Sequence, residues 1–283
     1  MDKYKPVKSL LKGLIILEAF TSPKHSLSFQ ELTLKTGMPK ATVFRFLHTL
    51  ISQNYISFDS KSKKYFVGPR VMSLGFAVLS NLELRDSALP YLEDLSRASN
   101  QHINLGILDR TEVIFIERIS KWSLVNINVR VGSRVPAYQS STGRAILAFS
   151  DQEKFQSVLN ELLRDAEALK SIGPGGKKLT MVLEQTRRRG YALNDEELVN
   201  GVRAIAAPIF NAQGQAEGAV NMPVFSYDVS RKELINRYLP MLLDTAEKIS
   251  AARGFIDRKQ ISQGPCSRKV SLPTLGEPEK KPA

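Results

Sequence analysis

Residues 28–54, SFQELTLKTGMPKATVFRFLHTLISQN, combine two short helical patterns with a glycine between them. Ser28 and Glu31 have the spacing of a capping box, which predicts that a helix begins here. Gly37 can adopt the left-handed backbone that closes this helix, and Pro39 suits the first turn of the next one. Two short helices joined by a tight glycine turn are typical of a helix-turn-helix, whose second helix enters the major groove of DNA.

The second of these helices divides into an inner and an outer face. Four apolar residues recur at the spacing of a core-facing stripe: Val43, Phe46, Leu47 and Leu50. The remaining residues face outward and are predicted to contact DNA: Lys40, Ala41, Thr42, Phe44, Arg45, His48 and Thr49.

The next stretch, YISFDSKSKKYFVG at residues 55–68, alternates as two strands around a polar turn. Such a hairpin is the wing of a winged helix-turn-helix, and Asn54 before it is predicted to be left-handed. Lys61, Lys63 and Lys64 fall at the tip of the wing or just beyond it, where lysine holds phosphate without sequence preference. The alternative is a small helical domain with a solvated basic face.

Another helix is predicted at residues 9–20. Leu10, Leu14 and Leu17 share one helical face with Phe20 close to it, so this face is expected to pack in the core. Pro23 follows and helps to end the helix.

The net charge of +12 is concentrated near the N-terminus. Residues 1–80 contain 12 Lys and Arg against 4 Asp and Glu, a net +8. Residues 81–256 contain 22 against 21, and residues 257–283 contain 6 against 3. Because each neutralised phosphate releases counterions, such a local basic field favours nucleic acid as the partner.

The composition predicts a cytoplasmic protein without a membrane partner. No apolar run reaches the roughly 18 residues of a membrane-spanning helix. Lys12 and Glu18 interrupt the apolar stretch near the N-terminus, which argues against a signal peptide. Cys266 is the single cysteine, so an internal disulfide and a cysteine-cluster metal site are excluded.

The rest of the chain is predicted to form a linker helix and an α+β domain. Residues 70–82 carry an apolar stripe of Val71, Leu74, Val78 and Leu82, which needs a partner in a second domain or another subunit. The predicted helices that follow are 86–99, 151–163, 179–190 and 231–253, and residues 140–149 are predicted to be a small-residue turn that runs into a helix. The predicted strands are 103–108, 113–119, 124–131, 204–210 and 217–225. The predicted division is a winged helix-turn-helix at 1–68, a linker helix at 69–84, an effector-binding domain at 85–256 and a disordered tail at 257–283.

Motifs for enzyme chemistry are missing, and no cofactor or metal is predicted. The sequence has no HExxH, GxSxG or CxxC motif. The glycine-rich stretch SIGPGGKKLT at 171–180 lacks the spacing of a phosphate-binding P-loop and is interpreted as a surface loop. His102 is interpreted as a hydrogen-bonded structural histidine, with metal ligation as the alternative.

One polar constellation remains in the second domain. Residues 140–142, two serines and a threonine, precede a helix that begins near Gly143, where free N–H groups favour an anion. Residues 194–197, NDEE, are predicted to form an acidic loop. Asn221 interrupts the apolar strand GAVNMPV and is either a satisfied core amide or part of a ligand pocket.

From Ser9 to Gly254 the chain resembles the isocitrate-lyase-regulator (IclR) family of bacterial transcription regulators. The resemblance is carried, in order, by SLLKGLIILEAF, PKATVFRFLHTL, KYFVGPRVMSLG, VRVGSRVPAYQSSTGRAILA, LEQTRRRGYALNDEE and GVRAIAAPIFNAQGQAEGAV. It implies a winged helix-turn-helix, a linker helix and a GAF-like antiparallel sheet flanked by helices. It also implies dimers or tetramers on palindromic operators that control catabolic operons in response to a small organic acid.

The resemblance further implies which residues hold the effector. They are Leu124, Ser141, Thr142, Asn194, Ala204, Asn221 and Pro223. Members that sense glyoxylate or pyruvate carry aspartate at the position of Asn194, cysteine at Ala204, and serines at Asn221 and Pro223. These departures argue against glyoxylate, and the stretch INVRVGSRVPAYQSSTGRAIL is more similar to the branch that controls breakdown of aromatic acids such as protocatechuate.

Two other functions remain open. An enzyme with an appended winged helix would turn over a small organic acid, whereas a scaffold protein would have an empty pocket. Ligand recovered unchanged after long incubation argues against the enzyme. Thermal stabilisation by an acid argues against the scaffold.

Overall fold

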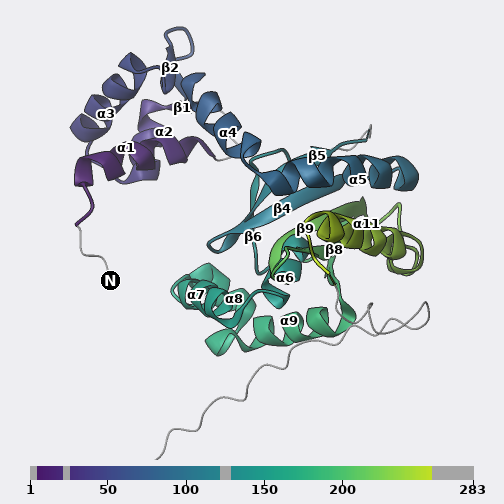
Figure 1. The fold of residues 1–283 in the computed structure, drawn as a ribbon. Coiled ribbons are helices and arrows are strands. Elements are labelled where there is room, and N and C mark those ends of the chain that lie inside the picture. The colour runs from purple at the N-terminus through teal and green to yellow at the C-terminus, as the bar shows by residue number, and fades with distance from the viewer. Residues whose placement is uncertain (1–4, 22–25, 122–128, 257–283) are drawn as a thin grey trace, which may run out of the picture. The chain divides into compact units, whose positions relative to one another are not determined.

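The computed structural model describes residues 5–21, 26–121 and 129–256, which form two compact units, one through Leu82 and one from Glu83 (Figure 1). The first unit is mainly helical with a small sheet, and the second is a larger sheet with helices on both faces. The predicted α+β class is therefore confirmed. No helix in these ranges has the length and apolar character needed to cross a membrane.

The first unit contains the predicted helix-turn-helix and wing. Its helices are α1 (Lys8–Glu18), α2 (Phe29–Thr36), α3 (Lys40–Ser52) and α4 (Arg70–Ser80). Its strands, in the sheet order β1-β3-β2, are β1 (Ser26–Ser28), β3 (Lys64–Val67) and β2 (Ile56–Asp59). The capping box is present, with Glu31 N donating to Ser28 Oγ over 3.2 Å and Ser28 N donating to Glu31 Oε2 over 2.8 Å. Gly37 has a φ of 65° and ends α2, so the predicted turn is confirmed.

The predicted core face of α1 is only partly right, because Leu17 and Phe20 pack in the core but Leu10 and Leu14 do not. Leu10 and Leu14 are 64% and 45% exposed, whereas Ile16 and Phe20 are buried. Nearly every face of α1 carries an apolar residue, so spacing alone did not identify the face that packs. Packing against α2 and α3 selects the face that contains Ile16.

Helix α4 begins as predicted and ends at Ser80, so Leu82 lies beyond it. None of its residues is buried. Its large apolar side chains are exposed: Met72, Leu74, Phe76 and Val78. Among the described residues of its own unit, α4 therefore leaves these apolar side chains without a packing partner.

The second unit contains a six-stranded antiparallel sheet in the order β6-β5-β4-β9-β8-β7. The strands are β4 (Ile103–Asp109), β5 (Glu112–Ile119), β6 (Arg134–Pro136), β7 (Ala192–Asp195), β8 (Val202–Phe210) and β9 (Ala216–Phe225). The helices are α5 (Glu83–Ser99), α6 (Ser141–Ala148), α7 (Gln152–Leu162), α8 (Ala166–Ile172), α9 (Lys177–Arg189), α10 (Arg231–Glu233) and α11 (Leu239–Ala252). Helices α5 and α11 pack together on the sheet, and α6 packs on it with α9 beside α6 (Figure 1).

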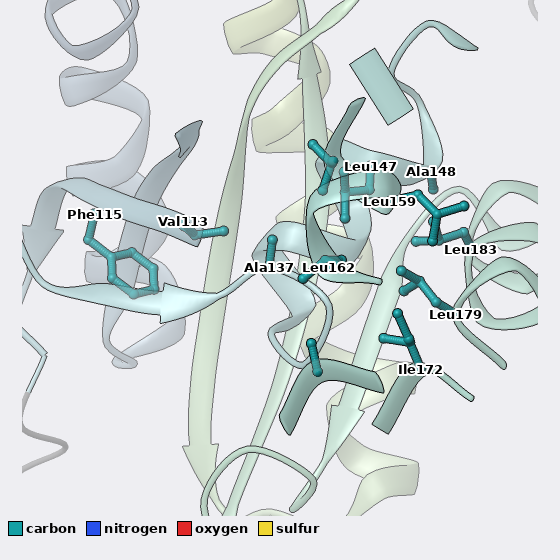
Figure 2. Packing of buried hydrophobic residues seen from close by; sticks show 12 residues of the cluster. Val113, Phe115, Ala137, Leu147, Ala148, Leu159, Leu162, Ile172, Leu179 and Leu183 are labelled. Atoms are coloured by element: carbon teal, nitrogen blue, oxygen red, sulfur yellow. The ribbon is translucent and has the colours of Figure 1, made fainter. Parts of the chain in front are cut away.

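A second apolar layer forms where α6 meets α7, α8 and α9. Figure 2 shows Leu147 of α6 near side chains from these helices, and Val113 and Ala137 belong to the same cluster. The predicted surface loop at 171–180 is wrong, because residues 174–176 form a short 3-10 turn that leads into α9. Gly176 is buried there, and an added Cβ would lie 2.4 Å from Leu159 Cδ1.

Three other predictions need correction. Residues 124–128 of the predicted third strand lie outside the described residues, residues 129–131 are not a strand, and the strand found nearby is β6. Asn194 and Asp195 belong to β7, not to a loop, because they pair with Ala204 and Arg203 of β8. The predicted final helix is interrupted by a π-helical turn at Leu234–Tyr238.

Candidate DNA interface and effector site

The outer face of α3 presents the residues predicted to contact DNA. Val43 and Leu47 are fully buried and turn one side of the helix inward. Thr42 is half-buried. The other predicted contacts are exposed: Lys40, Ala41, Phe44, Arg45, His48 and Thr49. The hydroxyl of Thr49 donates to Arg45 O over 3.0 Å, and the rings of Phe44 and His48 are 6.4 Å apart between centroids.

The wing turn is organised by one carboxylate. Asp59 Oδ1 accepts from Lys61 N over 2.9 Å, and Asp59 Oδ2 accepts from the Ser62 hydroxyl over 2.6 Å. These hydrogen bonds, that from the Ser62 hydroxyl foremost, lower the pKa of Asp59 below its ordinary value. Lys63 has a φ of 54°, and Lys64 is the first residue of β3. The turn therefore places three lysines within four residues at the tip of the hairpin.

The basic side chains of this surface form no ion pairs with the described carboxylates. Within the described parts of the chain, no carboxylate lies within ion-pair distance of Lys40, Arg45 or the wing lysines. Several arginines of the second unit are paired, for example Arg134 with Asp109 and Glu112. The first unit therefore presents cations that a phosphate backbone can neutralise.

The start of α6 is a buried, polar helix N-terminus. Ser140 Oγ accepts from Gly143 N over 3.0 Å and caps the helix. A Cβ added to Gly143 would lie 2.3 Å from Ala137 Cα, so glycine is needed for the helix to approach this backbone. Ser141 is 2% exposed and Thr142 is fully buried. The positive end of α6 is therefore enclosed by protein, where it favours a negative charge.

The sheet face under α6 carries two neighbouring rows of side chains. In one row, Asn194, Ala204 and Pro223 are cross-strand partners on β7, β8 and β9. In the other row, Arg118, Asn104 and Asn221 are cross-strand partners on β5, β4 and β9, followed by Ala206 and Ala192. Asn221 and Pro223 point to the same face because they are two residues apart on one strand. The register therefore brings four of the predicted effector residues together.

Hydrogen bonds join the second row to α6. Asn221 Nδ2 donates to Ser141 Oγ over 3.0 Å, and Asn104 Nδ2 donates to Asn221 Oδ1 over 2.7 Å. Arg118 Nη1 donates to Asn104 Oδ1 over 3.0 Å. Thr142 Oγ1 is buried and has no hydrogen-bond partner among the residues that the structure describes. Such an atom is costly in a folded protein unless a ligand or water satisfies it.

Asn194 is held by the loop before α6, because its Nδ2 donates to Gln139 O over 2.5 Å. Of the predicted effector residues, Leu124 lies outside the described residues. The other six are buried: Ser141, Thr142, Asn194, Ala204, Asn221 and Pro223. Asn221 is thus hydrogen-bonded within the core, as one interpretation of the sequence expected, whereas its place in a ligand pocket stays a prediction.

Two polar residues of this cluster were missed by the sequence analysis. Asn104 interrupts the apolar strand INLGIL in the same way that Asn221 interrupts GAVNMPV, and this signal could have identified it. Arg118 lies near the end of β5 and had no such signal, because only the β4–β5 register places it opposite Asn104.

A salt bridge closes the same region. Arg144 of α6 is 6% exposed, and its guanidinium donates to both carboxylate oxygens of Glu197 over 2.9 and 2.7 Å. The hydrogen bond from Arg144 lowers the pKa of Glu197. Arg144 Nε also donates to Tyr138 O over 2.9 Å. This paired geometry ties the segment after β7 to α6 and gives the Glu197 carboxylate a cationic partner.

His102 has the structural role predicted for it. Its Nδ1 accepts from Lys121 N over 3.1 Å, and burial, followed by the charge of Arg118, lowers its pKa. A neutral imidazole is the form that accepts at Nδ1. No group of three or more His, Cys, Asp or Glu residues with metal-binding geometry occurs within residues 5–21, 26–121 and 129–256.

An open hollow of about 390 Å³ lies elsewhere, beside α7. Its lining includes Leu108, Arg110, Asp151 and Lys154, none of which belongs to the buried polar residues around the start of α6. Arg110 pairs with Glu161 over 2.6 Å at its edge. The hollow is open and partly lined by charged side chains, and none of the predicted effector residues lines it.

Both parts of the chain match known protein families. Residues 9–60 match the IclR helix-turn-helix domain, and residues 76–251 match the C-terminal domain of the bacterial transcriptional regulator IclR. The chain is 34% identical over 236 residues to the Pca regulon regulatory protein of Pseudomonas putida, which covers 83% of this chain and 80% of that protein. It is 31% identical over 253 residues to the HTH-type transcriptional regulator KdgR of Escherichia coli K12, which covers 89% of this chain and 94% of that protein.

Solved structures share the fold. An IclR family transcriptional regulator from Brucella abortus has a TM-score of 0.73 at 28% identity, covering 89% of this chain and 94% of that one. An IclR homologue from Microbacterium hydrocarbonoxydans, complexed with 4-hydroxybenzoate, has a TM-score of 0.69 and covers 86% of this chain and 98% of that one. At 23% identity, this second likeness shows the fold alone. The chain belongs to the IclR family of bacterial transcription regulators, with a DNA-binding helix-turn-helix domain and an effector-binding C-terminal domain.

Proposed function

We propose that this regulator binds an operator through α3 and the wing, and that a small aromatic carboxylate bound at the start of α6 changes its operator binding. The single observation that carries the effector site is Thr142 Oγ1, a fully buried hydroxyl without a hydrogen-bond partner. It lies in the first turn of α6, where the helix dipole favours an anion. The carboxylate of the effector supplies the missing acceptor.

The remaining predicted residues define the body of the pocket. Ala204 and Pro223 offer no hydrogen-bond donor at positions where glyoxylate-sensing relatives offer a thiol and a hydroxyl. An apolar ring fits such a surface better than a second polar group, because a buried donor left unpaired costs binding energy. The 34% identity to a Pca regulon regulatory protein supports a ligand of the aromatic-acid class. Leu124 completes the proposed set.

On the DNA side, the roles divide between specificity and affinity. Arg45 is exposed on α3 and is the side chain best suited to bidentate contact with a guanine edge. Lys40, at the start of α3, contributes to DNA binding in this proposal. The wing lysines contact phosphate and add affinity that depends on salt but not on sequence.

We also infer that the active species is a homodimer or a dimer of dimers on a palindromic operator. Exposed apolar residues on α1 and α4, such as Leu10, Leu14, Leu74 and Val78, support this inference. Light scattering of the full chain tests it, with Leu74→Ser/Val78→Ser expected to lower the mass. The matched control is Leu169→Ser, which removes a partly exposed leucine of α8. An unchanged mass in the double variant would contradict the role of α4.

The effector proposal is tested by a thermal-shift screen followed by DNA binding. Aromatic and keto acids, including protocatechuate and 4-hydroxybenzoate, are screened, and hits are tested for a change in affinity for the DNA upstream of the gene. A ligand that binds only the folded state must raise its unfolding temperature. Stabilisation without any change in DNA binding would contradict the regulatory role of the site.

The rival function, an enzyme with an appended winged helix, is tested in the same samples. We propose that the protein does not turn the acid over, so chromatography after prolonged incubation recovers the acid unchanged. Conversion that depends on the protein and is lost in Thr142→Val would favour the enzyme.

A further inference from the structure

A chain of four hydrogen-bonding side chains runs from the sheet into the first turn of α6. Arg118 donates to Asn104, Asn104 to Asn221, and Asn221 to Ser141, over 3.0, 2.7 and 3.0 Å. Asn104, Asn221 and Ser141 are 1%, 5% and 2% exposed, so bulk water does not compete for these bonds. The chain therefore connects a permanent charge to the proposed carboxylate position.

The direction of this chain is determined by its first member. An asparagine amide can present its oxygen or its nitrogen, and either orientation is isosteric. Arginine carries only donors and stays charged, so Asn104 must turn Oδ1 toward Arg118 and Nδ2 toward Asn221. Asn221 must then turn Oδ1 toward Asn104 and Nδ2 toward Ser141. Both amide orientations thus follow from Arg118.

These orientations determine the role of Ser141, the last member of the hydrogen-bonded series. Ser141 Oγ accepts from Asn221, so its own proton remains to be donated. Among the described residues, no hydrogen bond is seen in which the Ser141 hydroxyl donates. The adjacent Thr142 hydroxyl is also buried without a partner. The two hydroxyls therefore each have a proton to donate in the first turn of α6, and a group with two acceptor oxygens has the acceptors that both protons require.

We propose, on the basis of the effector site proposed above, that Arg118 and Asn104 are positioning residues that make Ser141 an obligatory donor and so select a ligand carboxylate. Neither residue needs to touch the ligand. They determine whether the Ser141 hydroxyl donates or accepts in its hydrogen bond to the ligand. A carboxylate presents two acceptors to the site, an aldehyde presents one acceptor, and a primary amide presents one acceptor and one donor.

The decisive variant is Asn104→Asp, which keeps the size of the side chain. The carboxylate still accepts from Arg118, but its second oxygen faces Asn221 Oδ1 and forces that amide to turn. Asn221 Oδ1 then accepts from Ser141, whose proton is no longer available to the ligand. The variant reverses the chain without removing a side chain from the core.

Three ligands of one shape separate this reversal from simple charge repulsion: 4-hydroxybenzoate, 4-hydroxybenzaldehyde and 4-hydroxybenzamide. Their dissociation constants are measured by calorimetry on the full chain. In Asn104→Asp, the affinity ratio of acid to amide should fall by about tenfold or more, and the ratio of aldehyde to amide should fall in the same direction. Repulsion from the added charge would lower the first ratio and leave the second, between two neutral ligands, unchanged.

Control variants identify the cause. Asn160→Asp makes the same chemical change at an exposed position of α7 and should change neither ratio. Arg118→Lys keeps a donor-only cation and should retain the preference for the acid. Arg118→Met removes the donor that orients Asn104 and should weaken that preference.

A ligand-free measurement tests the chain directly. In the wild type, the side-chain NH₂ protons of Asn221 should give NOEs to the β protons of Ser141, and in Asn104→Asp they should lose them. Unchanged NOEs, or unchanged ligand ratios in Asn104→Asp, would overturn the inference while leaving the proposed effector site intact. If the wild type binds none of the three ligands, the proposed aromatic-acid site is wrong at that point, and the NOEs alone decide the direction of the chain.

Discussion

The outer face of α3 and the buried start of α6 both carry polar side chains, but these side chains differ in their burial and in whether they have bonding partners. On α3 and the wing, the cations are exposed and have no carboxylate partner within the described ranges. At α6, Ser141, Asn104 and Asn221 are almost fully buried and bonded to one another. A surface that meets a polyanion needs cations that cost nothing to keep in water, because phosphate replaces their counterions.

A buried site works differently, because each polar atom must have a partner or lose the free energy of its hydration. Its few unpartnered atoms therefore indicate what the ligand brings. The hydroxyl of Thr142 at the proposed effector site corresponds in this sense to the unpaired cations of the proposed DNA surface. Each lacks a partner, and the partner that we propose is held by geometry at Thr142 and by charge at the cations.

The largest expected effect comes from a substitution that disrupts only the buried site. Gly143→Val places a side chain against the Ala137 backbone and should destabilise the second unit by about 3 kcal/mol, as overpacked cores do. Calorimetry should show a lower unfolding temperature for the second unit and an unchanged unfolding temperature for the helical first unit. Gly75→Ala is the control, since open space surrounds its Cβ position on α4. Equal stability of Gly143→Val and the wild type would contradict the close packing of α6.

On the exposed surface, Arg45→Ala should lower affinity for the operator by about 2 kcal/mol and reduce discrimination against scrambled DNA. Fluorescence anisotropy on both duplexes measures the difference. Arg97→Ala removes an exposed arginine of α5 that pairs with Asp94, and it should change neither affinity. A uniform loss on both duplexes in Arg45→Ala would assign Arg45 to phosphate contact instead.

Thr142→Val sharpens the contrast between stability and binding. It removes the unpartnered hydroxyl and keeps the shape, so the free protein should become more stable by about 1 kcal/mol. Affinity for the acid should fall by about tenfold, because the valine offers no donor. Thr186→Val is the matched control, since the buried Thr186 hydroxyl already donates to Val182 O. Thermal unfolding with and without ligand measures both effects, and a destabilised Thr142→Val would show that the hydroxyl has a partner.

A smaller effect is expected at the wing. Lys63→Ala should weaken all duplexes about equally, by less than about 1 kcal/mol, and should reduce the slope of log affinity against log salt by about one. Lys170→Ala, at an exposed lysine of α8, should leave the slope unchanged. A sequence-dependent loss in Lys63→Ala would mean that the wing reads bases.

The smallest effect concerns the shape of the wing turn and its pH dependence. Hydrogen bonds from Ser62 and Lys61 lower the pKa of Asp59 below 3.8, its ordinary value. The ordering that these bonds provide is thus complete above that value and is lost only as the pH falls through the lowered pKa. The amide shifts of Lys61 and Ser62 should titrate below pH 3.8 in NMR spectra. Asp59→Asn should abolish this titration, and a midpoint above 3.8 would contradict the bonding of the turn.

The helix-turn-helix and its exposed contacts could be predicted from the sequence because their signals are local. The capping box at Ser28, the left-handed Gly37 and the core spacing of Val43 and Leu47 each lie within one or two turns of helix. Exposed cations also need no partner, so counting charges by segment was enough to locate them. Within the first unit, local patterns failed where apolar residues surround a helix, as in α1, whose packed face depends on its neighbours.

The proposed effector site shows the same division between local sequence signals and features that depend on the tertiary structure. The sequence by itself determined the polar helix start at residues 140–142 and the unusual amide at Asn221, and the family resemblance supplied the positions of Asn194, Ala204 and Pro223. Only the tertiary structure joined them, because strand register places Asn194, Ala204 and Pro223 in one row and Asn221 beside Asn104 in the next. Arg118 entered through the same register. Residues this far apart in the chain meet only through strand pairing, and no local pattern encodes which strands pair or with what offset.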